Sequence, residues 1–243
     1  MGIVVQKFGG SSVKNTEKLF DICKHITKEY DKGKKVVVIV SAQGNTTDNL
    51  IKEAKEINEN IDKRELDVLI SVGEQITIAK LVMCLKKLGY KAISLTGWQI
   101  PIKTNNIHGD ADILKINLNR ILEELENKNI VIIAGFQGIN EENNDITTLG
   151  RGGSDTTAVA IAAALQADKC DIYKDVEGIY DVDPKTNQKA FKNDTITYDK
   201  MLNLSNNGAK VLHNKSVELA KKFNMPIHIK YLYDENSRGT YIF

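Results

Sequence analysis

The stretch TTLGRGGSDTTAVAIAAAL, residues 147–165, decides the fold. Its glycine turn, GRGG at 150–153, leaves backbone N–H groups accessible to a bound anion, because glycine has no side chain to block the approach. The next four residues favour the start of a helix, and AVAIAAAL at 158–165 predicts a helix buried on most of its surface. Unpaired N–H groups and the helix dipole favour an anion there, and Arg151 adds a planar fork for a carboxylate or phosphate. A lone glycine turn of this kind also enters ordinary core helices, so the rest of the chain must decide.

Apolar runs typical of strands alternate with helical segments along the whole chain. Strands are predicted at 2–8, 36–42, 90–95, 130–139, 167–173, 226–231 and 239–242. Helices are predicted up to about residue 30 and at 49–60, 63–88, 112–126, 158–165, 198–204 and 211–223. The stretch 96–113 is left open between a lid and a hairpin, and 175–185 has turn and hairpin chemistry. The alternation predicts an α/β fold, a three-layer αβα sandwich with a mostly parallel central sheet.

The composition excludes several classes of protein. Lys and Arg number 33 against 32 Asp and Glu, a formal charge of +1, so no global field would attract nucleic acid or an acidic membrane. No apolar run is expected to approach the roughly 20 residues of a membrane span. The widely spaced Cys23, Cys84 and Cys170 indicate a reducing compartment, and the four histidines lack the pairing of a metal site. The sequence therefore predicts a cytoplasmic protein with no metal-ligating side chains and no nucleic-acid or membrane partner.

A second glycine turn follows the first predicted strand. Lys7 stands at the end of that strand, just before Gly9 and Gly10. The turn matches neither GxGxxG nor the P-loop pattern, so neither of those nucleotide folds is indicated. Short polar side chains, among them Ser41 and Thr47, follow the second strand, where a small polar substrate would need them. Glu74 interrupts an otherwise apolar helix face and is therefore expected to face a polar group.

The carboxyl ends of parallel strands should bring these loops to one edge of the sheet. That edge would collect the cations Lys7, Arg151, Lys174 and Lys210 and the carboxylates Glu74 and Asp155. Two glycine turns with several cations and few carboxylates suit phosphoryl transfer, in which catalysis consists mostly of positioning and charge neutralisation.

Seven blocks of sequence stand out in order along the chain. They are KFGGSSV at 7–13, SAQGNTTDNL at 41–50, VGEQIT at 72–77, AGFQGIN at 134–140, the stretch 147–165, DVEGIYDVDP at 175–184 and GAKVLH at 208–213. Over essentially all 243 residues the chain resembles the catalytic domain of aspartate kinases, in the amino-acid-kinase family. The resemblance implies the amino-acid-kinase fold with two lobes, an aspartate-binding lobe over about 1–150 and an ATP-binding lobe over about 151–243. Because the family's C-terminal ACT modules would begin beyond residue 243, we expect no ACT regulatory domain in this sequence and no inhibition by lysine or threonine.

The resemblance implies transfer of the γ-phosphoryl group of ATP to the β-carboxylate of L-aspartate, giving 4-phospho-L-aspartate, the first step toward lysine, threonine and methionine. The catalytic residues would be Lys7 and Asp155. Aspartate would be held by Ser41, Thr47, Glu74, Arg151, Gly152, Gly153 and Ser154. ATP would be held by Lys7, Phe8, Gly9, Gly10, Ser11, Lys174, Asp175, Tyr180, Asp183, Lys185 and Lys210. Mg²⁺ would be held mainly by the phosphates, and no general base is implied, since a carboxylate that titrates near ~3.9 is already a nucleophile at pH 7.

Three alternatives stay open at this stage. A related family member could act on glutamate, N-acetylglutamate, carbamate or UMP, although the acceptor-side residues suit a free amino acid with two carboxylates better. A regulatory or catalytically weak subunit would fit the departures from the family pattern at Lys185, 214–216 and 230–232, although Lys7 and Asp155 are both present. A nucleotide-binding structural protein would leave the acceptor-side residues unused. A homodimer is compatible with the fold.

Overall fold

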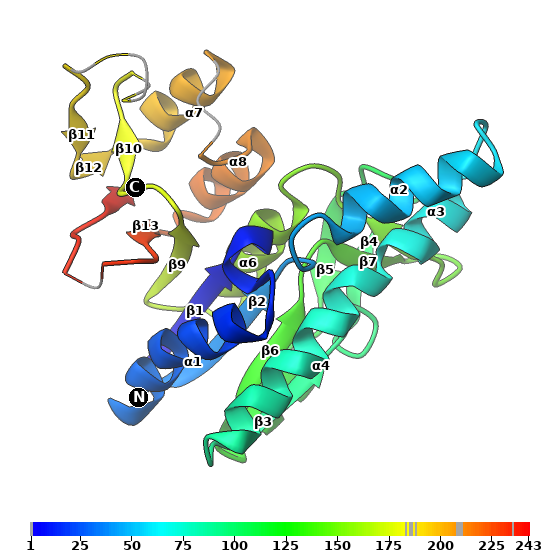
Figure 1. The fold of residues 1–243 in the computed structure, drawn as a ribbon, viewed down its shortest axis with the longest axis horizontal. Coiled ribbons are helices and arrows are strands. Elements are labelled where there is room, and N and C mark those ends of the chain that lie inside the picture. The colour runs from blue at the N-terminus through cyan, green and yellow to red at the C-terminus, as the bar shows by residue number, and fades with distance from the viewer. Residues whose placement is uncertain (1, 183, 185–186, 188, 208–210, 235) are drawn as a thin grey trace.

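The main sheet runs through the whole molecule. The computed structural model describes residues 2–182, 184, 187, 189–207, 211–234 and 236–243. Among those residues the main sheet has eight strands, in the order β12-β14-β13-β9-β1-β2-β6-β3. Neighbours are parallel except β13 and β14, so the carboxyl ends of β9, β1, β2 and β6 meet at one edge (Figure 1). The bounds are Ile3–Phe8 (β1), Lys35–Val40 (β2), Ala92–Leu95 (β3), Ile130–Ala134 (β6), Lys169–Lys174 (β9), Thr195–Ile196 (β12), Ile227–Tyr231 (β13) and Thr240–Ile242 (β14).

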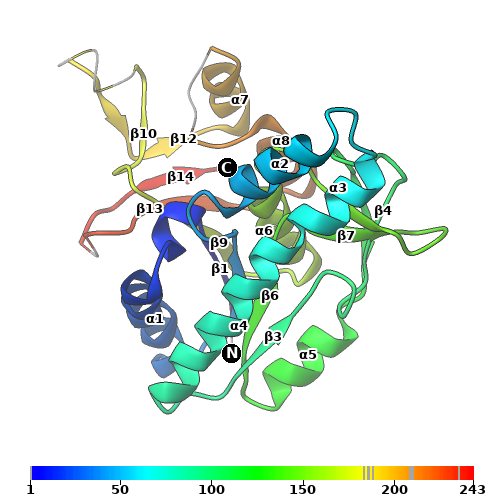
Figure 2. The same ribbon diagram turned by 45° about the vertical axis from the view of Figure 1, so that its right-hand side comes forward.

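Helices cover both faces of this sheet, because successive side chains of each strand enter two separate apolar cores. Val4, Val36 and Val38 belong to the core under α1 and α4. Their neighbours Val5 and Val37 belong to the core under α5, α6, α7 and α8. Figure 2 shows α1 and α4 in front of the strands. The predicted three-layer αβα sandwich is confirmed. The helix bounds are Thr16–Asp31 (α1), Val72–Lys87 (α4), Asn119–Glu126 (α5), Gly153–Ala164 (α6), Tyr198–Asn206 (α7) and Asn214–Phe223 (α8).

A smaller four-stranded sheet stands beyond the carboxyl edge of the main one, in the order β5-β4-β7-β8. The helices α2 and α3 lie beside it, and α3 packs against β8 (Figures 1 and 2). The stretch 96–113, left open in the sequence, supplies β4 and the first residue of β5. The remaining bounds are Gly10–Val13 (the 3-10 helix η1), Thr46–Ile57 (α2), Lys63–Ile70 (α3), Ile102–Thr104 (β4), Ile113–Ile116 (β5), Gln137–Asn140 (β7), Ile146–Thr148 (β8) and the antiparallel pair Ile179–Tyr180 (β10) and Lys192–Asn193 (β11).

Three predicted elements are wrong in their bounds. The predicted helix 63–88 is two helices that break at Ser71, whose hydroxyl donates to the carbonyl of Val68 at 2.8 Å. The predicted helix 112–126 begins only with α5, because the residues of β5 pair with β4. The predicted strand 130–139 is interrupted at Phe136, whose φ of 71° is left-handed and cannot continue a strand. This interruption sends β7 into the smaller sheet.

The expectation that no apolar run approaches the length of a membrane span is also wrong. By length and composition alone, the 25 residues Lys63–Lys87 could cross a membrane, with a mean hydropathy of 1.7 over the most apolar window. More than half of that window is buried inside the protein, and Ile78, Leu81 and Leu85 of α4 belong to the core under the main sheet. The hydropathy of the run is therefore explained by its place as a core helix.

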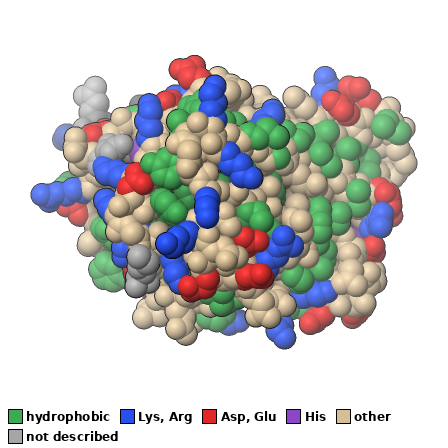
Figure 3. All heavy atoms as spheres, turned by 90° about the horizontal axis from the view of Figure 1, so that it is seen from below, with side chains coloured by type: hydrophobic (Ala, Val, Ile, Leu, Met, Phe, Trp, Pro, Cys, Tyr) green, Lys and Arg blue, Asp and Glu red, His purple; other side chains and the backbone are tan. Residues whose placement is uncertain are grey.

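Charged side chains of both signs are mixed on the face seen in Figure 3. This agrees with the balanced count of 33 cations and 32 carboxylates in the sequence. Several surface charges are paired, for example Lys34 with Asp168 at 2.9 Å. Exposed pairs of this kind contribute little to stability, and this face shows no extended field of one sign.

Candidate active site

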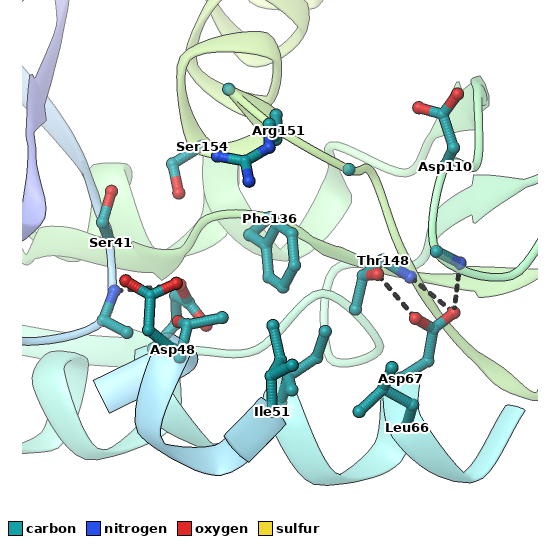
Figure 4. A pocket seen from close by; sticks show the side chains of 18 of the residues that line it. Ser41, Asp48, Ile51, Leu66, Asp67, Asp110, Phe136, Thr148, Arg151 and Ser154 are labelled. Carbon is teal, nitrogen blue, oxygen red and sulfur yellow. Dashed lines mark hydrogen bonds between the residues drawn. The ribbon is translucent and has the colours of Figure 1, made fainter. Parts of the chain in front are cut away.

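A cavity of about 800 Å³ opens at the carboxyl edge of the main sheet. Its walls come from the turn after β1, the loop after β2, the helices α2 and α3, the start of α4, the loop 107–110, and the turn 150–153 with the start of α6. Figure 4 shows Arg151 and Ser154 on one side of the cavity, Phe136 in the middle and Asp67 near the far side. The volume is that of a typical small-molecule site.

Asp155, in the first turn of α6, forms ion pairs with two lysines. Its Oδ1 lies 2.6 Å from Nζ of Lys7, and its Oδ2 lies 2.9 Å from Nζ of Lys174. Asp155 and Lys7 are 4% and 5% exposed. Burial alone would raise the pKa of Asp155, but the charges of Lys7 and Lys174 outweigh it and lower this pKa to about 2. Two ammonium groups and one carboxylate give this cluster a net positive charge.

Glu74, in the first turn of α4, is a second buried carboxylate, and one of its oxygens faces no protein donor. It is 3% exposed, and its Oε1 accepts a hydrogen bond from the backbone N–H of Ala42 at 2.9 Å. Its Oε2 is buried without a hydrogen-bond partner among the described residues. Burial raises the pKa of Glu74 to about 7. Because a buried unpaired oxygen is unfavourable, this position favours a ligand that carries a donor.

The turn 150–153 can only be built from glycine at two of its positions. Gly150 and Gly152 both have φ of 74°, in the left-handed region that side chains disfavour. A Cβ on Gly152 would also stand 2.4 Å from Cβ of His213. Gly152 is the N-cap of α6, so the turn presents the positive end of that helix to the cavity. Arg151 is exposed, and Figure 4 shows its guanidinium beside Ser154 and above Phe136.

The structure brings the predicted acceptor-side residues together. The predicted residues that line the cavity are Lys7, Gly10, Ser41, Thr47, Glu74, Arg151, Gly152, Gly153, Ser154 and Asp155. Lys174 joins them through its ion pair with Asp155. Phe8 does not line the cavity: its ring is fully buried and stacks on Tyr173 with 4.6 Å between centroids, so only its backbone could face a ligand.

Of the residues predicted to hold ATP, Lys7 and Gly10 line the cavity, and the other described ones lie away from its wall. Among the described ones, Gly9, Ser11, Asp175 and Tyr180 do not line it, and the Tyr180 hydroxyl donates to Glu177 at 3.2 Å. Asp183, Lys185 and Lys210 lie outside the described residues. The part of the chain that the structure describes contains no group of three or more His, Cys, Asp or Glu side chains that could hold a metal ion.

Several cavity residues were missed by the sequence analysis. They include Ile51, Asp67, His108, Asp110 and Phe136. Phe136 lies within the block AGFQGIN, so that block already held the signal. The sequence analysis found in the four histidines only the lack of metal-site pairing, yet His108 lines the cavity, with its Nδ1 3.0 Å from Oδ2 of Asp67. Asp67 is one charged residue among several in a helical pattern, and nothing local in the sequence separates it from a solvated one.

Known sequences match this chain from end to end. The model of the Amino acid kinase family matches residues 2–231. The chain is 52% identical to the Aspartokinase of Geobacillus stearothermophilus and 50% identical to Aspartokinase 2 of Bacillus subtilis (strain 168), each over 242 residues. These alignments cover 100% of this chain and 59% of each relative, so the chain spans about three fifths of the length of these curated relatives.

Solved structures agree with the sequence comparison. The aspartate kinase from Synechocystis has 42% sequence identity and a TM-score of 0.88, over 99% of this chain and 39% of that one. The E. coli aspartokinase III in complex with aspartate and ADP has 26% identity and a TM-score of 0.89, over 99% of this chain and 64% of that one. The UMP kinase from Bacillus anthracis, at 21% identity and a TM-score of 0.69, shares the fold. The family match and these identities show that the chain belongs to the amino acid kinase family.

Proposed function

We propose that this chain is the catalytic part of an aspartate kinase, which transfers the γ-phosphoryl group of ATP to the β-carboxylate of L-aspartate. The observation that carries the proposal is the buried cluster of Lys7, Asp155 and Lys174 beside a cavity that also holds Glu74 and Arg151. About half of the residues are identical to those of two aspartokinases over the whole chain, and this similarity supports the same reaction.

The acceptor would be held by groups that complement an amino acid with two carboxylates. The unpaired Oε2 of Glu74 suits the α-ammonium group, which supplies a donor and a positive charge. Arg151, at the edge of the cavity, suits a carboxylate, because its guanidinium can donate two parallel hydrogen bonds. The hydroxyls of Ser41, Thr47 and Ser154 line the same cavity and would complete the acceptor site. An acceptor with one carboxylate or none would leave part of this set unpaired.

The phosphoryl transfer would depend on charge neutralisation. An oxygen of the acceptor β-carboxylate attacks the γ-phosphorus while the bond to the bridging oxygen of ADP breaks. Lys7 would stabilise the charge on the transferring group, assisted by the backbone at Gly9 and Gly10 and by the positive end of α6. Asp155 would hold Lys7 and Lys174 in place through its two ion pairs. The acceptor is already a carboxylate at pH 7, so no general base is needed.

ATP would approach from the carboxyl ends of β1 and β9, where Lys174, Asp175 and Tyr180 follow one another. Mg²⁺ would be bound chiefly by the phosphates, where it neutralises their charge. Asp155, a buried carboxylate on the cavity wall, is already compensated by two lysines. This pairing fits a metal ion that takes few ligands from the protein.

The proposal is tested by measuring ATP-dependent ADP formation with L-aspartate, L-glutamate and UMP as separate acceptors. We expect product with L-aspartate and at least a tenfold lower rate with either of the others. Faster turnover of glutamate or UMP would contradict the assigned acceptor. Bound ATP without turnover of any acceptor would contradict catalysis and favour a regulatory subunit.

A further inference from the structure

Asp67 is a buried carboxylate on α3 whose oxygens are all used by the protein. Its side chain is 1% exposed. Its Oδ1 accepts from the hydroxyl of Thr148 at 2.6 Å, and its Oδ2 accepts from the backbone N–H groups of Thr148 and Gly109, both at 3.0 Å. The Nδ1 of His108 also lies 3.0 Å from Oδ2. Figure 4 shows the bonds to Thr148 and to the neighbouring backbone N–H. In contrast to Glu74, Asp67 presents no unpaired oxygen to a ligand.

The partners of Asp67 come from two distant segments that both line the cavity. His108 and Gly109 belong to the loop between β4 and β5, 41 and 42 residues along the chain from Asp67. Thr148 is the last residue of β8, 81 residues along the chain and just before the turn 150–153. The carboxylate therefore ties α3 to the cavity loop and to the strand that leads into the anion-binding turn.

The cavity loop rests directly on that turn. A Cβ on Gly150 would lie 2.7 Å from Oδ1 of Asp110 and 3.1 Å from the carbonyl oxygen of Gly109. On its other side the loop is held by Lys215 of α8, whose Nζ lies 2.7 Å from Oδ1 of Asp110 and 2.9 Å from Oδ1 of Asp112. The loop is thus held between α3 and α8 and seated against the residue that precedes Arg151.

We propose that Asp67 is a positioning residue for the acceptor: by fixing Thr148 and Gly109 it holds the turn 150–153 so that Arg151 and the N-terminus of α6 face the acceptor carboxylate. The inference rests on the proposed function for its substrate. Displacements of about 1 Å in positioning groups can reduce rates a hundredfold. The four contacts of Asp67 to Thr148, His108 and Gly109 are therefore expected to affect acceptor binding, because they fix the segments next to this turn.

The substitution Asp67→Asn tests this role with little change in volume. The amide NH₂ of Asn is a donor, and it must face at least one of the groups that now donate to Asp67. Two donors cannot form a hydrogen bond with each other, so a contact to the cavity loop or to β8 is lost. We expect the KM for L-aspartate to rise about tenfold while the KM for ATP changes less than twofold. Thr148→Val, which removes the hydroxyl donor and leaves the carboxylate, is expected to shift the same KM in the same direction.

The matched control is Arg64→Gln, on the same helix. Arg64 pairs with Asp145 at 3.1 Å and is not among the residues that line the cavity. Its replacement disturbs a tie between α3 and Asp145, the residue before β8, but removes no contact of Thr148 or of the cavity loop, so both KM values are expected to stay at the wild-type level. An equal shift of the aspartate KM in Arg64→Gln and Asp67→Asn would overturn the proposal, as would an unchanged KM in Asp67→Asn and Thr148→Val.

Hydrogen–deuterium exchange gives a readout that needs no acceptor. We expect faster exchange at 105–112 and 147–153 in Asp67→Asn and wild-type exchange at these segments in Arg64→Gln. If the wild-type protein failed to phosphorylate aspartate, the proposed function would fall, and exchange alone would decide whether Asp67 fixes the turn. Unchanged exchange at 147–153 in Asp67→Asn would contradict the inference in either case.

Discussion

At the scale of residues, two carboxylates in one cavity are driven in opposite directions by their surroundings. Burial raises the pKa of Glu74 to about 7, and among the described residues its side chain accepts a hydrogen bond from one other residue, through the backbone N–H of Ala42. Asp155 is equally buried, but Lys7 and Lys174 lower its pKa to about 2. Opposed shifts of this kind separate the roles of neighbouring acids. Asp155 is fixed as an anion, whereas Glu74 becomes an anion only near neutral pH.

The first prediction concerns the pH dependence of aspartate binding. The Glu74 pKa of about 7 means that its carboxylate form, which would pair with the α-ammonium group, grows as pH rises from 6 to 8. The KM for L-aspartate is therefore expected to fall over this range. In Glu74→Gln the KM should be raised at least tenfold and should lose this pH dependence. Steady-state kinetics at constant ionic strength would show it; a pH profile that Glu74→Gln leaves intact would contradict the role of Glu74.

The second prediction concerns stability at the same residue. The folded pKa of about 7 exceeds the ordinary value of 4.5, so the native state binds more protons than the unfolded state between these pH values. The free energy of unfolding should therefore fall by about 3 kcal/mol as pH rises from 4.5 to 7 through this group alone. Glu74→Gln cannot titrate, and we expect it to be more stable than the wild type at pH 8.

Urea unfolding of the wild type, Glu74→Gln and the exposed control Glu53→Gln at pH 5 and pH 8 measures this effect. The Glu53 side chain lies on the surface of α2, so its replacement should leave the pH dependence unchanged. Equal stability of the wild type and Glu74→Gln at pH 8 would contradict the prediction, because it would show that burial of the ionised Glu74 carboxylate does not destabilise the folded protein.

At the scale of elements, the turn before α6 determines how the site is built. Gly152 is left-handed, caps α6 and leaves no room for a Cβ beside His213. An alanine there would add a steric clash to the cost of the left-handed conformation. We expect Gly152→Ala to reduce turnover at least tenfold and to lower stability by more than the roughly 1–2 kcal/mol that the conformation alone costs.

The control for this third prediction is Gly89→Ala. Gly89 is also left-handed, with φ of 89°, but a Cβ there would meet nothing within 4 Å. Gly89 follows α4 at the end away from the cavity. Its replacement should therefore lower the free energy of unfolding only by the cost of the left-handed conformation, and turnover should stay unchanged. Thermal unfolding and turnover of the two variants would be compared; a Gly152→Ala enzyme as active as Gly89→Ala would contradict the role of the turn.

The elements that the sequence predicted best are those whose chemistry is local. The turn 150–153, the strand β1 that carries Lys7 and the buried helix α6 each have their pattern within a few residues. The break of the strand at Phe136 was missed because a left-handed bulky residue has no local signal. The partners of Asp67 were missed because they lie 41 to 81 residues away and meet only after the smaller sheet has formed. Lys174 was assigned to the nucleotide, and its pairing with Asp155 required the register of β1 beside β9.

At the scale of the whole molecule, one sheet joins both parts of the chain. β1 pairs with β2 on one side and with β9 on the other, so strands from before and after residue 150 share backbone hydrogen bonds. The lobes over about 1–150 and 151–243 remain a prediction, as does a homodimer, but any such lobes share the central strands. The site lies where the two parts meet, with Lys7 on β1 and Asp155 on α6.

The fourth prediction follows from this shared sheet. We expect urea to unfold the protein in one transition, because separating the two parts would break the pairing of β1 with β9. Fluorescence of Trp98, the single tryptophan, reports on the first part, and far-ultraviolet circular dichroism reports on both. Coincident midpoints would agree with one cooperative unit. A Trp98 transition at a clearly different urea concentration would indicate two independent units.

The most direct test of the account is ATP-dependent formation of an acyl phosphate from L-aspartate, trapped with hydroxylamine as the hydroxamate. Wild-type protein, Lys7→Met and the exposed control Lys52→Met would be assayed side by side after their folding has been checked by circular dichroism. The account predicts hydroxamate from the wild type and Lys52→Met, and a loss of at least a hundredfold in Lys7→Met, because the charge that stabilises the transferring phosphoryl group is gone. Hydroxamate formation by Lys7→Met at the wild-type rate would contradict it.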